Sequence, residues 1–262
     1  MFFVKMRGRP YYFSGGEMSD RGMFFKANGT GKGGNYTGGG ATSVFYCFIL
    51  SSFLFALTVI PVRVVFDEAY RASTEYRLIL FQLIAGVFFL RLPRLLSTPL
   101  GIDLPDGLYI AYMLFLWGAI FLGEFALLYY RVTIWDSVMH LYSAVLLSLL
   151  GLSLPTLLTG EKISPLLTAV IATCFSVFIG VLWEIYEFSF DGLLGLNMQK
   201  FALPLGDKIK LTPLVGRAAL IDTMSDLIVD TVGAVAVSLS AYFYIKKKGA
   251  LPRALIVERI RK

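Results

Sequence analysis

Long apolar segments alternate with short polar connections over most of the chain. Apolar runs cover residues 42–66, 76–96, 107–130, 134–154, 165–190 and 219–245. Each is about 18 residues or longer, the length that an α-helix needs to cross the hydrocarbon layer of a membrane. Charged or proline-containing stretches separate the runs, including 67–75, 91–105 and a loop expected to open at Leu154-Pro155. The pattern predicts an all-α, polytopic membrane protein with a bundle of six transmembrane helices.

Composition supports a membrane protein and excludes several other classes. Hydrophobic residues make up 56% of the chain and charged residues only 16%, whereas soluble domains are about 25% charged. Cys47 and Cys174 both lie inside apolar runs, so a disulfide framework is not expected. The net charge of +6 comes from tails and loops beside the spans, without the interleaved aromatic and basic residues of a nucleic-acid surface. The partner to expect is the lipid bilayer, with no nucleic acid.

The spans divide the chain into three regions. Residues 1–41 form a glycine-rich basic tail that we expect to be disordered, 42–245 the transmembrane domain, and 246–262 a basic tail. Lys and Arg are more numerous in the tails and the alternate loops on their side, which predicts a multi-pass protein of the cell membrane with both termini cytoplasmic. The long connection 191–218 then lies outside. Its apolar side chains are expected to cover the mouth of the bundle: Phe201, Leu203, Leu205, Ile209 and Leu211.

The last apolar run carries three acids at intervals of four residues, namely Asp222, Asp226 and Asp230. On an α-helix they share one face and span about 12 Å of rise. An acid near the middle of a membrane helix costs about 2.5 to 3.5 kcal/mol, so three acids require a compensating partner, protons or a cation.

Neighbouring runs place further polar residues at a similar depth. Asp136 and His140 are spaced i,i+4 at the outer start of the fourth run, and Glu184 and Glu187 are spaced i,i+3 at the outer end of the fifth. Two more acids lie close to this level: Glu124 and Asp191. The chain contains one histidine, so a His-rich metal cluster is excluded. Oxygen ligands with one imidazole would suit Mg, Mn, Ca, Fe(II) or Zn.

These residues form the candidate site. Protonation of some carboxyls is one way to relieve their charge, and Arg131 or Arg217 reaching in as a counter-charge is another. Binding of a divalent cation is the third, with His140 and Glu184 as candidate catalytic groups. The candidate metal ligands are Asp136, His140, Glu184, Glu187, Asp222, Asp226 and Asp230.

Simpler roles compete with this interpretation. Asp136 and Asp222 lie near helix starts and could act as N-caps. Glu184 and Glu187 have aromatic neighbours and could belong to an interfacial belt. His140 alone is typical of an interhelical hydrogen bond. The serines nearby and a small-residue surface on the last helix are most simply packing features: Ser143, Ser225, Gly233, Ala234, Ala236, Ser238, Ser240 and Ala241.

The second half of the chain resembles the YjdF-like family of uncharacterised polytopic inner-membrane proteins. The residues that carry the resemblance are Asp136 and His140 in WDSVMH, Glu184 and Glu187 in LWEIYE, and the segment DTMSDLIVDTVGA that begins at Asp222. A fainter similarity to VanZ-like proteins rests on the aspartate-to-histidine spacing and the later aspartate-to-glycine stretch. The long glycine-rich tail and Asp230 depart from the family pattern. The resemblance implies a fold and a site rather than a reaction.

Three functions fit the sequence. The first is a metal-assisted enzyme, such as a hydrolase that acts on a lipid or small molecule delivered through the membrane. In it a cation held by Asp226, Asp230, Glu187 and His140 would acidify a water, and Glu184 would accept the proton. The second is a proton- or divalent-cation-coupled transporter, which with six helices would form a homo-oligomer. The third is a scaffold in which the polar cluster only holds the helices together.

Overall fold

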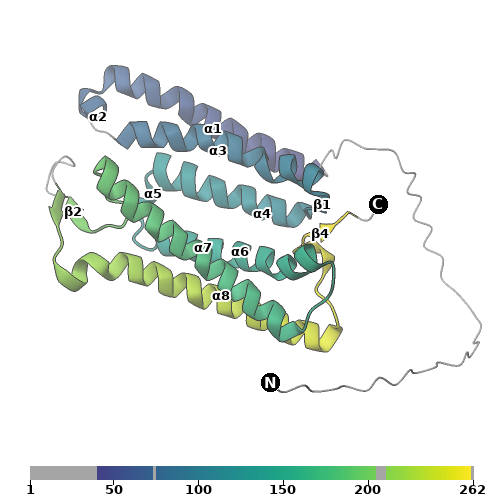
Figure 1. Ribbon diagram of the computed structural model, residues 1–262. Helices are drawn as coiled ribbons and strands as arrows, with labels where there is room; N and C mark the ends of the chain where they lie inside the picture. Colours follow the sequence, from purple (N-terminus) through teal and green to yellow (C-terminus); the bar gives the residue numbers. More distant parts are fainter. Residues whose placement is uncertain (1–39, 73–74, 205–210, 261–262) are drawn as a thin grey trace, which may run out of the picture. The chain divides into compact units, whose positions relative to one another are not determined.

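The structure is a computed structural model that describes residues 40–260 apart from 73–74 and 205–210 (Figure 1). The first half of the chain forms α1 (Gly40–Phe66), α2 (Glu68–Ala72), α3 (Glu75–Leu100), α4 (Asp106–Leu116), the π-helix η1 (Trp117–Phe125) and α5 (Leu128–Arg131). The second half forms α6 (Trp135–Thr159), α7 (Pro165–Leu194), the 3₁₀ helix η2 (Gly216–Leu220), α8 (Ile221–Lys248) and the 3₁₀ helix η3 (Arg253–Leu255). The predicted tail 1–41 lies outside the described residues except for its last two.

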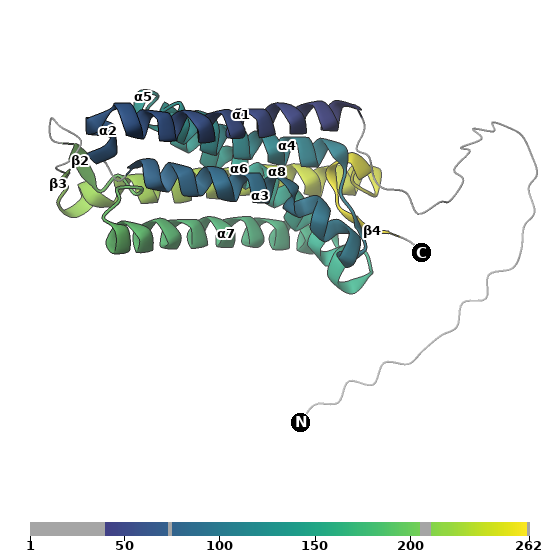
Figure 2. The same ribbon diagram turned by 90° about the horizontal axis from the view of Figure 1, so that it is seen from above.

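Two pairs of short antiparallel strands lie at opposite ends of the helices. β1 (Ile102–Asp103) pairs with β4 (Glu258–Arg259), and β2 (Ala202–Pro204) pairs with β3 (Leu211–Pro213). The long helices run side by side between these ends (Figure 2). We call the end that carries α2, β2 and the start of α8 the site end (Figure 1).

The prediction of six spans is confirmed. In the described part of the chain, six helical segments are long and apolar enough to cross a membrane. Their ends differ from the apolar runs, because two proline-containing stretches predicted as breaks are helical. α3 continues through Pro93 and Pro99 to Leu100, and α6 continues through Pro155 to Thr159. Prolines are tolerated in membrane helices, where neighbouring groups can satisfy the freed backbone carbonyls.

The third span is the least regular. α4 passes into η1, and the helix ends at Phe125 rather than at residue 130. Leu127 then adopts a left-handed conformation with φ 63°, and α5 forms a single turn before α6. π-Helical turns occur mostly as local insertions near functional sites. Here the irregular segment borders the candidate site.

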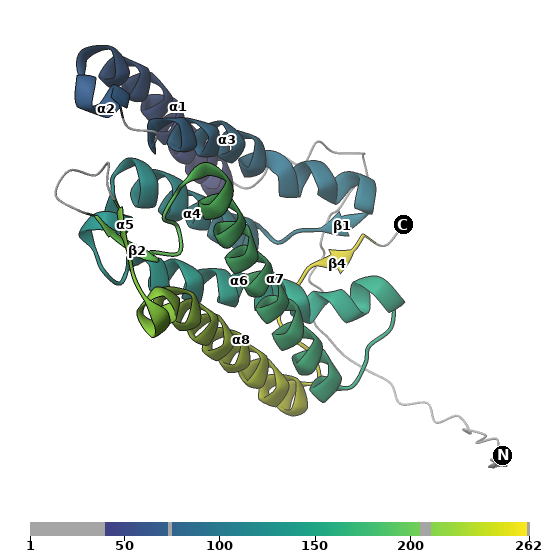
Figure 3. The same ribbon diagram turned by 60° about the vertical axis from the view of Figure 1, so that its left-hand side comes forward.

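The helices form two groups with different interiors (Figure 3). α1, α3 and α4 share a core of large apolar side chains that includes Phe53, Leu83 and Met113. α6, α7 and α8 pack closely on one another around small residues, with Leu152, Ala172 and Ala241 as their buried apolar core. The second group therefore places its polar side chains against one another rather than against a large hydrophobic core.

The C-terminal segment packs back onto the end of the bundle opposite the site. Val257 is buried, and its backbone N–H donates to Ser153 Oγ at 2.8 Å. Ile260 N–H donates to the carbonyl of Gly101 at 2.8 Å. The described part of the basic tail is therefore attached to the helices, a feature that its composition alone did not predict.

Candidate functional site

Glycines allow α6, α7 and α8 to approach closely. A Cβ atom added to Gly151 of α6 would lie 2.8 Å from Ala172 Cα in α7. One added to Gly233 of α8 would lie 2.9 Å from a methyl carbon of Leu141 in α6. Gly233 thus serves the packing role expected of the small-residue surface. Because the backbones are close, the polar side chains at the site end share one interior.

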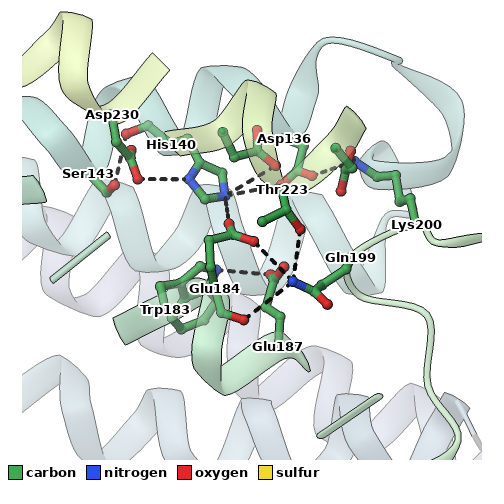
Figure 4. Close-up of polar contacts among 12 residues, drawn as sticks. Asp136, His140, Ser143, Trp183, Glu184, Glu187, Gln199, Lys200, Thr223 and Asp230 are labelled. Carbon is green, nitrogen blue, oxygen red and sulfur yellow. Dashed lines mark hydrogen bonds and ion pairs between the residues drawn. The ribbon is translucent and has the colours of Figure 1, made fainter. Parts of the chain in front are cut away.

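His140 lies at the centre of that interior (Figure 4). Its Nε2 atom is 3.9 Å from Asp136 Oδ1, 3.8 Å from Glu184 Oε1 and 3.8 Å from Asp226 Oδ2. All three helices of the group contribute, so the predicted convergence of these residues is observed. We call Asp136, His140, Glu184, Asp226 and Asp230 the His140 cluster.

The other ring nitrogen of His140 meets Asp230. Nδ1 lies 3.3 Å from Asp230 Oδ2. A hydrogen bond to a carboxylate places the proton on Nδ1, so a neutral His140 presents the lone pair of Nε2 to the remaining acids. Asp230 was predicted as a metal ligand, and this contact also suits it to orient the imidazole.

A glycine makes room for Asp230. A Cβ atom added to Gly180 of α7 would lie 2.4 Å from Asp230 Oδ2 and 3.2 Å from its Cγ. The carboxylate therefore occupies space that any other residue at position 180 would fill. Sequence reasoning missed Gly180, because a single glycine in an apolar run gives no sign of what lies opposite.

Several oxygens of the cluster are buried without a hydrogen-bond partner among the described residues, including Glu184 Oε1 and Asp226 Oδ2. Glu184, Asp226 and His140 expose only 4%, 2% and 6% of their surface. Buried polar atoms are nearly always satisfied, and an unsatisfied one points to a missing ion or water. The two orphan oxygens are the same atoms that lie near Nε2.

The spacing of these atoms fits a metal ion. Ligand atoms lie about 3.4 Å apart around tetrahedral zinc, and about 3.0 Å or 4.2 Å apart around octahedral magnesium. The 3.8–3.9 Å separations from Nε2 are somewhat longer than the tetrahedral distance and lie between the two octahedral distances. Ligand atoms of Asp136, His140 and Asp226 also all lie within 4.8 Å of one another. A shortening of about half an ångström would bring the separations from Nε2 to the tetrahedral distance.

Lys200 supplies the counter-charge at the mouth of the cluster. Its Nζ donates to Asp136 Oδ2, and to Asp222 Oδ1 at 3.0 Å. Burial alone would lower the pKa of Lys200, but the charges and hydrogen bonds of the two aspartates outweigh it and raise this pKa above its usual range. Lys200 itself has an unusual left-handed backbone with φ 46°.

This role for Lys200 corrects two sequence-based alternatives. Arg131 and Arg217 are exposed and make no ion pair within the described residues, so neither supplies the counter-charge. Asp136 and Asp222 do not act as N-caps, because the N-cap residues of α6 and α8 are Ile134 and Leu220. Both aspartates instead turn toward Lys200. No local sequence signal distinguished this lysine from other loop lysines.

The connection after α7 is tied to the site by Asp191 and Gln199. The buried Asp191 accepts backbone hydrogen bonds from Met198 at 2.7 Å and Gln199 at 3.0 Å. Gln199 Nε2 donates to Thr223 Oγ1 at 2.8 Å and lies 3.4 Å from Glu184 Oε2. The first part of this connection therefore lies against residues of the site. Its predicted apolar cover stays a prediction, because Leu205, Ile209 and the side chains of Leu203 and Leu211 lie outside what the structure describes.

The belt hypothesis for the two glutamates is wrong, because both are buried. Glu187 Oε1 accepts a hydrogen bond of 2.9 Å from Trp183 Nε1. Glu124 of η1 accepts a hydrogen bond of 3.2 Å from Gln82 Nε2. Each of these glutamates thus accepts a hydrogen bond from a neighbouring side chain, and the role of Glu187 as a metal ligand stays a prediction.

The two serines flagged as neighbours of the acids have ordinary roles. Ser143 donates to the backbone carbonyl of His140 at 2.8 Å, and Ser225 is exposed on α8. Ser143 thus has the helix role predicted for it, whereas the exposed Ser225 is not part of a packing surface.

Tyr129 is a further polar residue that sequence reasoning missed. Its ring packs on Gly123, where an added Cβ atom would lie 2.2 Å from a ring carbon. Burial raises the pKa of the Tyr129 phenol well above its usual value, and the charges of Asp136, Glu124, Glu187 and Asp226 raise it further. The η1 segment and the turn at Leu127 thus direct a neutral phenol toward the acids.

Comparison with known proteins places the chain in a family. A family described as "Predicted membrane protein (DUF2238)" matches residues 46–247, well over half of the chain. The chain belongs to this family. It is therefore a membrane protein whose lipid-facing helices surround a buried His/Asp group. No curated protein and no solved structure matches the chain.

Proposed function

We propose that the His140 cluster binds one divalent cation, with His140 Nε2, Asp136, Glu184 and Asp226 as ligands. One observation carries the proposal: His140 Nε2 lies 3.8–3.9 Å from three carboxylate oxygens that come from three helices. Without a positive charge between them, these four atoms would repel one another in a buried region.

The surrounding residues support the same role. Asp230 on Nδ1 forms the carboxylate–histidine arrangement that orients imidazole ligands in metal sites. Lys200 neutralises part of the charge of Asp136 and Asp222, which leaves the net negative charge deeper in the cluster. Asp222 is thereby a partner of Lys200 rather than a ligand. Glu187, held by Trp183, stays on the site wall.

We further propose that the protein is a metal-assisted enzyme acting on a membrane-delivered substrate, with the site opening to the outer face. A bound divalent cation supplies Lewis acidity to a water or a substrate oxygen. With Glu184 among the ligands and Asp191 bound to the amides of Met198 and Gln199, Glu187 is the carboxylate of α7 that remains to exchange protons. The narrower resemblance to YjdF-like proteins rests on the same aspartate, histidine and glutamate pairs and is consistent with this role.

The test measures metal binding directly. Protein purified in detergent and stripped with a chelator is titrated calorimetrically with Mn²⁺, Zn²⁺ and Mg²⁺. We expect one cation per chain for at least one of the metals. Asp226→Asn and His140→Ala should weaken that affinity by about a hundredfold or more, because each removes a ligand.

Asp67→Asn is the matched control, because Asp67 pairs with Arg63 at 3.6 Å on an exposed part of the same end. It should bind metal as the parent does. Size-exclusion profiles and thermal midpoints show whether each variant is folded. A parent that binds none of the three cations, or an Asp226→Asn variant that binds as tightly as the parent, would refute the proposal. Cation uptake by proteoliposomes would assign the bound metal to transport instead of catalysis.

A further inference from the structure

A second feature of the site end is an apolar groove between α3 and α7. It has a volume of about 350 Å³ and is lined by Arg77, Leu78, Phe81, Phe190, Leu194 and Leu196. This volume is at the lower end of the range for small-molecule sites. No residue of the groove belongs to the His140 cluster.

The groove forms because its two walls, α3 and α7, pack against different helices. α7 packs closely on α6 and α8, whereas α3 packs on α1 and η1. The core-facing side of α3 carries Ile79 and Leu83, which are buried. Phe81 points the other way and is 61% exposed, and Leu194 across the groove is 56% exposed. Both belong to helices that are long and apolar enough to span a membrane, which makes lipid the neighbour to expect for this groove.

One end of this apolar groove carries a positive charge. The Arg77 guanidinium donates from Nε to Tyr76 Oη at 3.3 Å, and no carboxylate among the described residues pairs with it. Two other arginines of the site end are paired with acids: Arg63 with Asp67, and Arg71 with Glu68. Arg131 and Arg217 also lack an ion pair in the described part of the chain, but neither lines the groove.

We propose that the groove binds an anionic phospholipid, with its headgroup phosphate on Arg77 and an acyl chain on Phe81, Phe190 and Leu194. A guanidinium matches a phosphate with two parallel hydrogen bonds. Aromatic and aliphatic side chains of a membrane-facing groove complement a hydrocarbon chain. A phospholipid combines a charged headgroup with hydrocarbon chains, which matches the charge at one end of the groove and its apolar walls.

The groove lies next to the site wall. Phe190 follows Glu187 by one helical turn, and Leu196 leads into the segment that carries Gln199 and Lys200. A lipid in the groove would therefore contact the elements that form the mouth of the His140 cluster. Binding here needs no metal, so it can be tested whether or not the cluster holds a cation.

The test measures lipid binding to the full-length protein in detergent by native mass spectrometry. Phosphatidylglycerol is the anionic probe and phosphatidylcholine of the same acyl chains is the zwitterionic one. We expect the parent to prefer phosphatidylglycerol. Arg77→Gln should weaken phosphatidylglycerol binding about tenfold, the effect of losing a charge-assisted contact. Arg131→Gln removes an exposed arginine outside the groove and should leave the preference unchanged.

A second variant tests the apolar part. Leu194→Trp fills the groove from an exposed position and should weaken binding of both lipids while Arg77 is intact. Equal binding of the two lipids by the parent, an unchanged affinity in Arg77→Gln or Leu194→Trp, or an equal loss in Arg131→Gln would overturn the proposal. Competition by millimolar inorganic phosphate would show a phosphate site rather than a lipid site and would also overturn it.

Discussion

Replacing Gly180 by alanine should disturb the His140 cluster without touching any of its residues. The added Cβ atom would lie 2.4 Å from Asp230 Oδ2, well inside van der Waals contact. The same oxygen is 3.3 Å from His140 Nδ1. Asp230 is buried, so its carboxylate can relieve the clash only by turning away from the imidazole or by separating α7 from α8.

Two magnitudes follow from this geometry. Losing a carboxylate that orients a histidine ligand weakens metal binding about 10- to 100-fold. Overpacking a tight helix contact costs about 1–3 kcal/mol of stability, and each kcal/mol lowers the thermal midpoint of a chain this long by about 2–4 °C. We therefore expect Gly180→Ala to bind the cation at least about tenfold more weakly and to melt several degrees lower. Calorimetric titration and thermal unfolding in detergent measure the two effects.

The chain provides a matched control on the same helix. Gly192 is also in α7, and a Cβ atom added there meets nothing within 4 Å. Gly192→Ala should leave metal affinity unchanged and should not lower the melting midpoint, because alanine favours a helix more than glycine does. The Asp230→Ala background removes the clashing carboxylate, so Gly180→Ala should cost less there. The reasoning is refuted if Gly180→Ala binds metal and melts as the parent does, or if its cost is the same in both backgrounds.

Three further outcomes are expected. Lys200→Met removes a positive charge beside the cluster and should tighten divalent-cation binding several-fold in the same titration; weaker binding would mean that the lysine chiefly orients its aspartates. Cation affinity should fall as pH is lowered from 8 to 6, because protons compete for the imidazole and carboxylate ligands. The pKa of Lys200 is raised in the folded protein. Its ion pairs are therefore fully present below about pH 10.5, the pKa of an unfolded lysine, and are lost only as pH rises through the folded-state pKa. Lys200 should thus contribute equally at pH 6 and pH 8, and Lys200→Met should show the same pH trend as the parent. Asp191→Ala removes the acceptor for the amides of Met198 and Gln199, worth about 1.5–3 kcal/mol per bond, and limited proteolysis should then cut the connection after α7 faster than in the parent.

Local sequence properties were enough to predict the six helices and the residues that meet at the site end. Hydropathy and length are additive along the chain, so the spans at residues 42–66 and 165–190 could be identified without knowing their neighbours. Helical spacing also put Asp226 and Asp230 on one face of α8, and the shared depth of Asp136, His140 and Glu184 predicted that they converge.

Roles within the cluster depended on interhelical geometry. Asp226 and Asp230 are equivalent in the sequence, yet Asp226 approaches Nε2 of His140 and Asp230 approaches Nδ1. Gly180 of α7 lies opposite Asp230 and leaves space for its carboxylate beside the imidazole. Helical periodicity contains no information about which residue of another helix lies opposite.

The counter-charge likewise required the tertiary structure. Lys200 is 64 residues from Asp136 and 22 from Asp222, and an irregular backbone brings its amino group between them. A loop conformation of this kind depends on distant contacts, such as those of Asp191, rather than on local propensity. The sequence by itself determined that buried acids at the site end needed a positive partner. Only the tertiary packing around α6, α7 and α8 decided which residue provides that positive partner and which carboxylate oxygens still lack a hydrogen-bond partner. Both outcomes depend on distances between segments far apart in the chain.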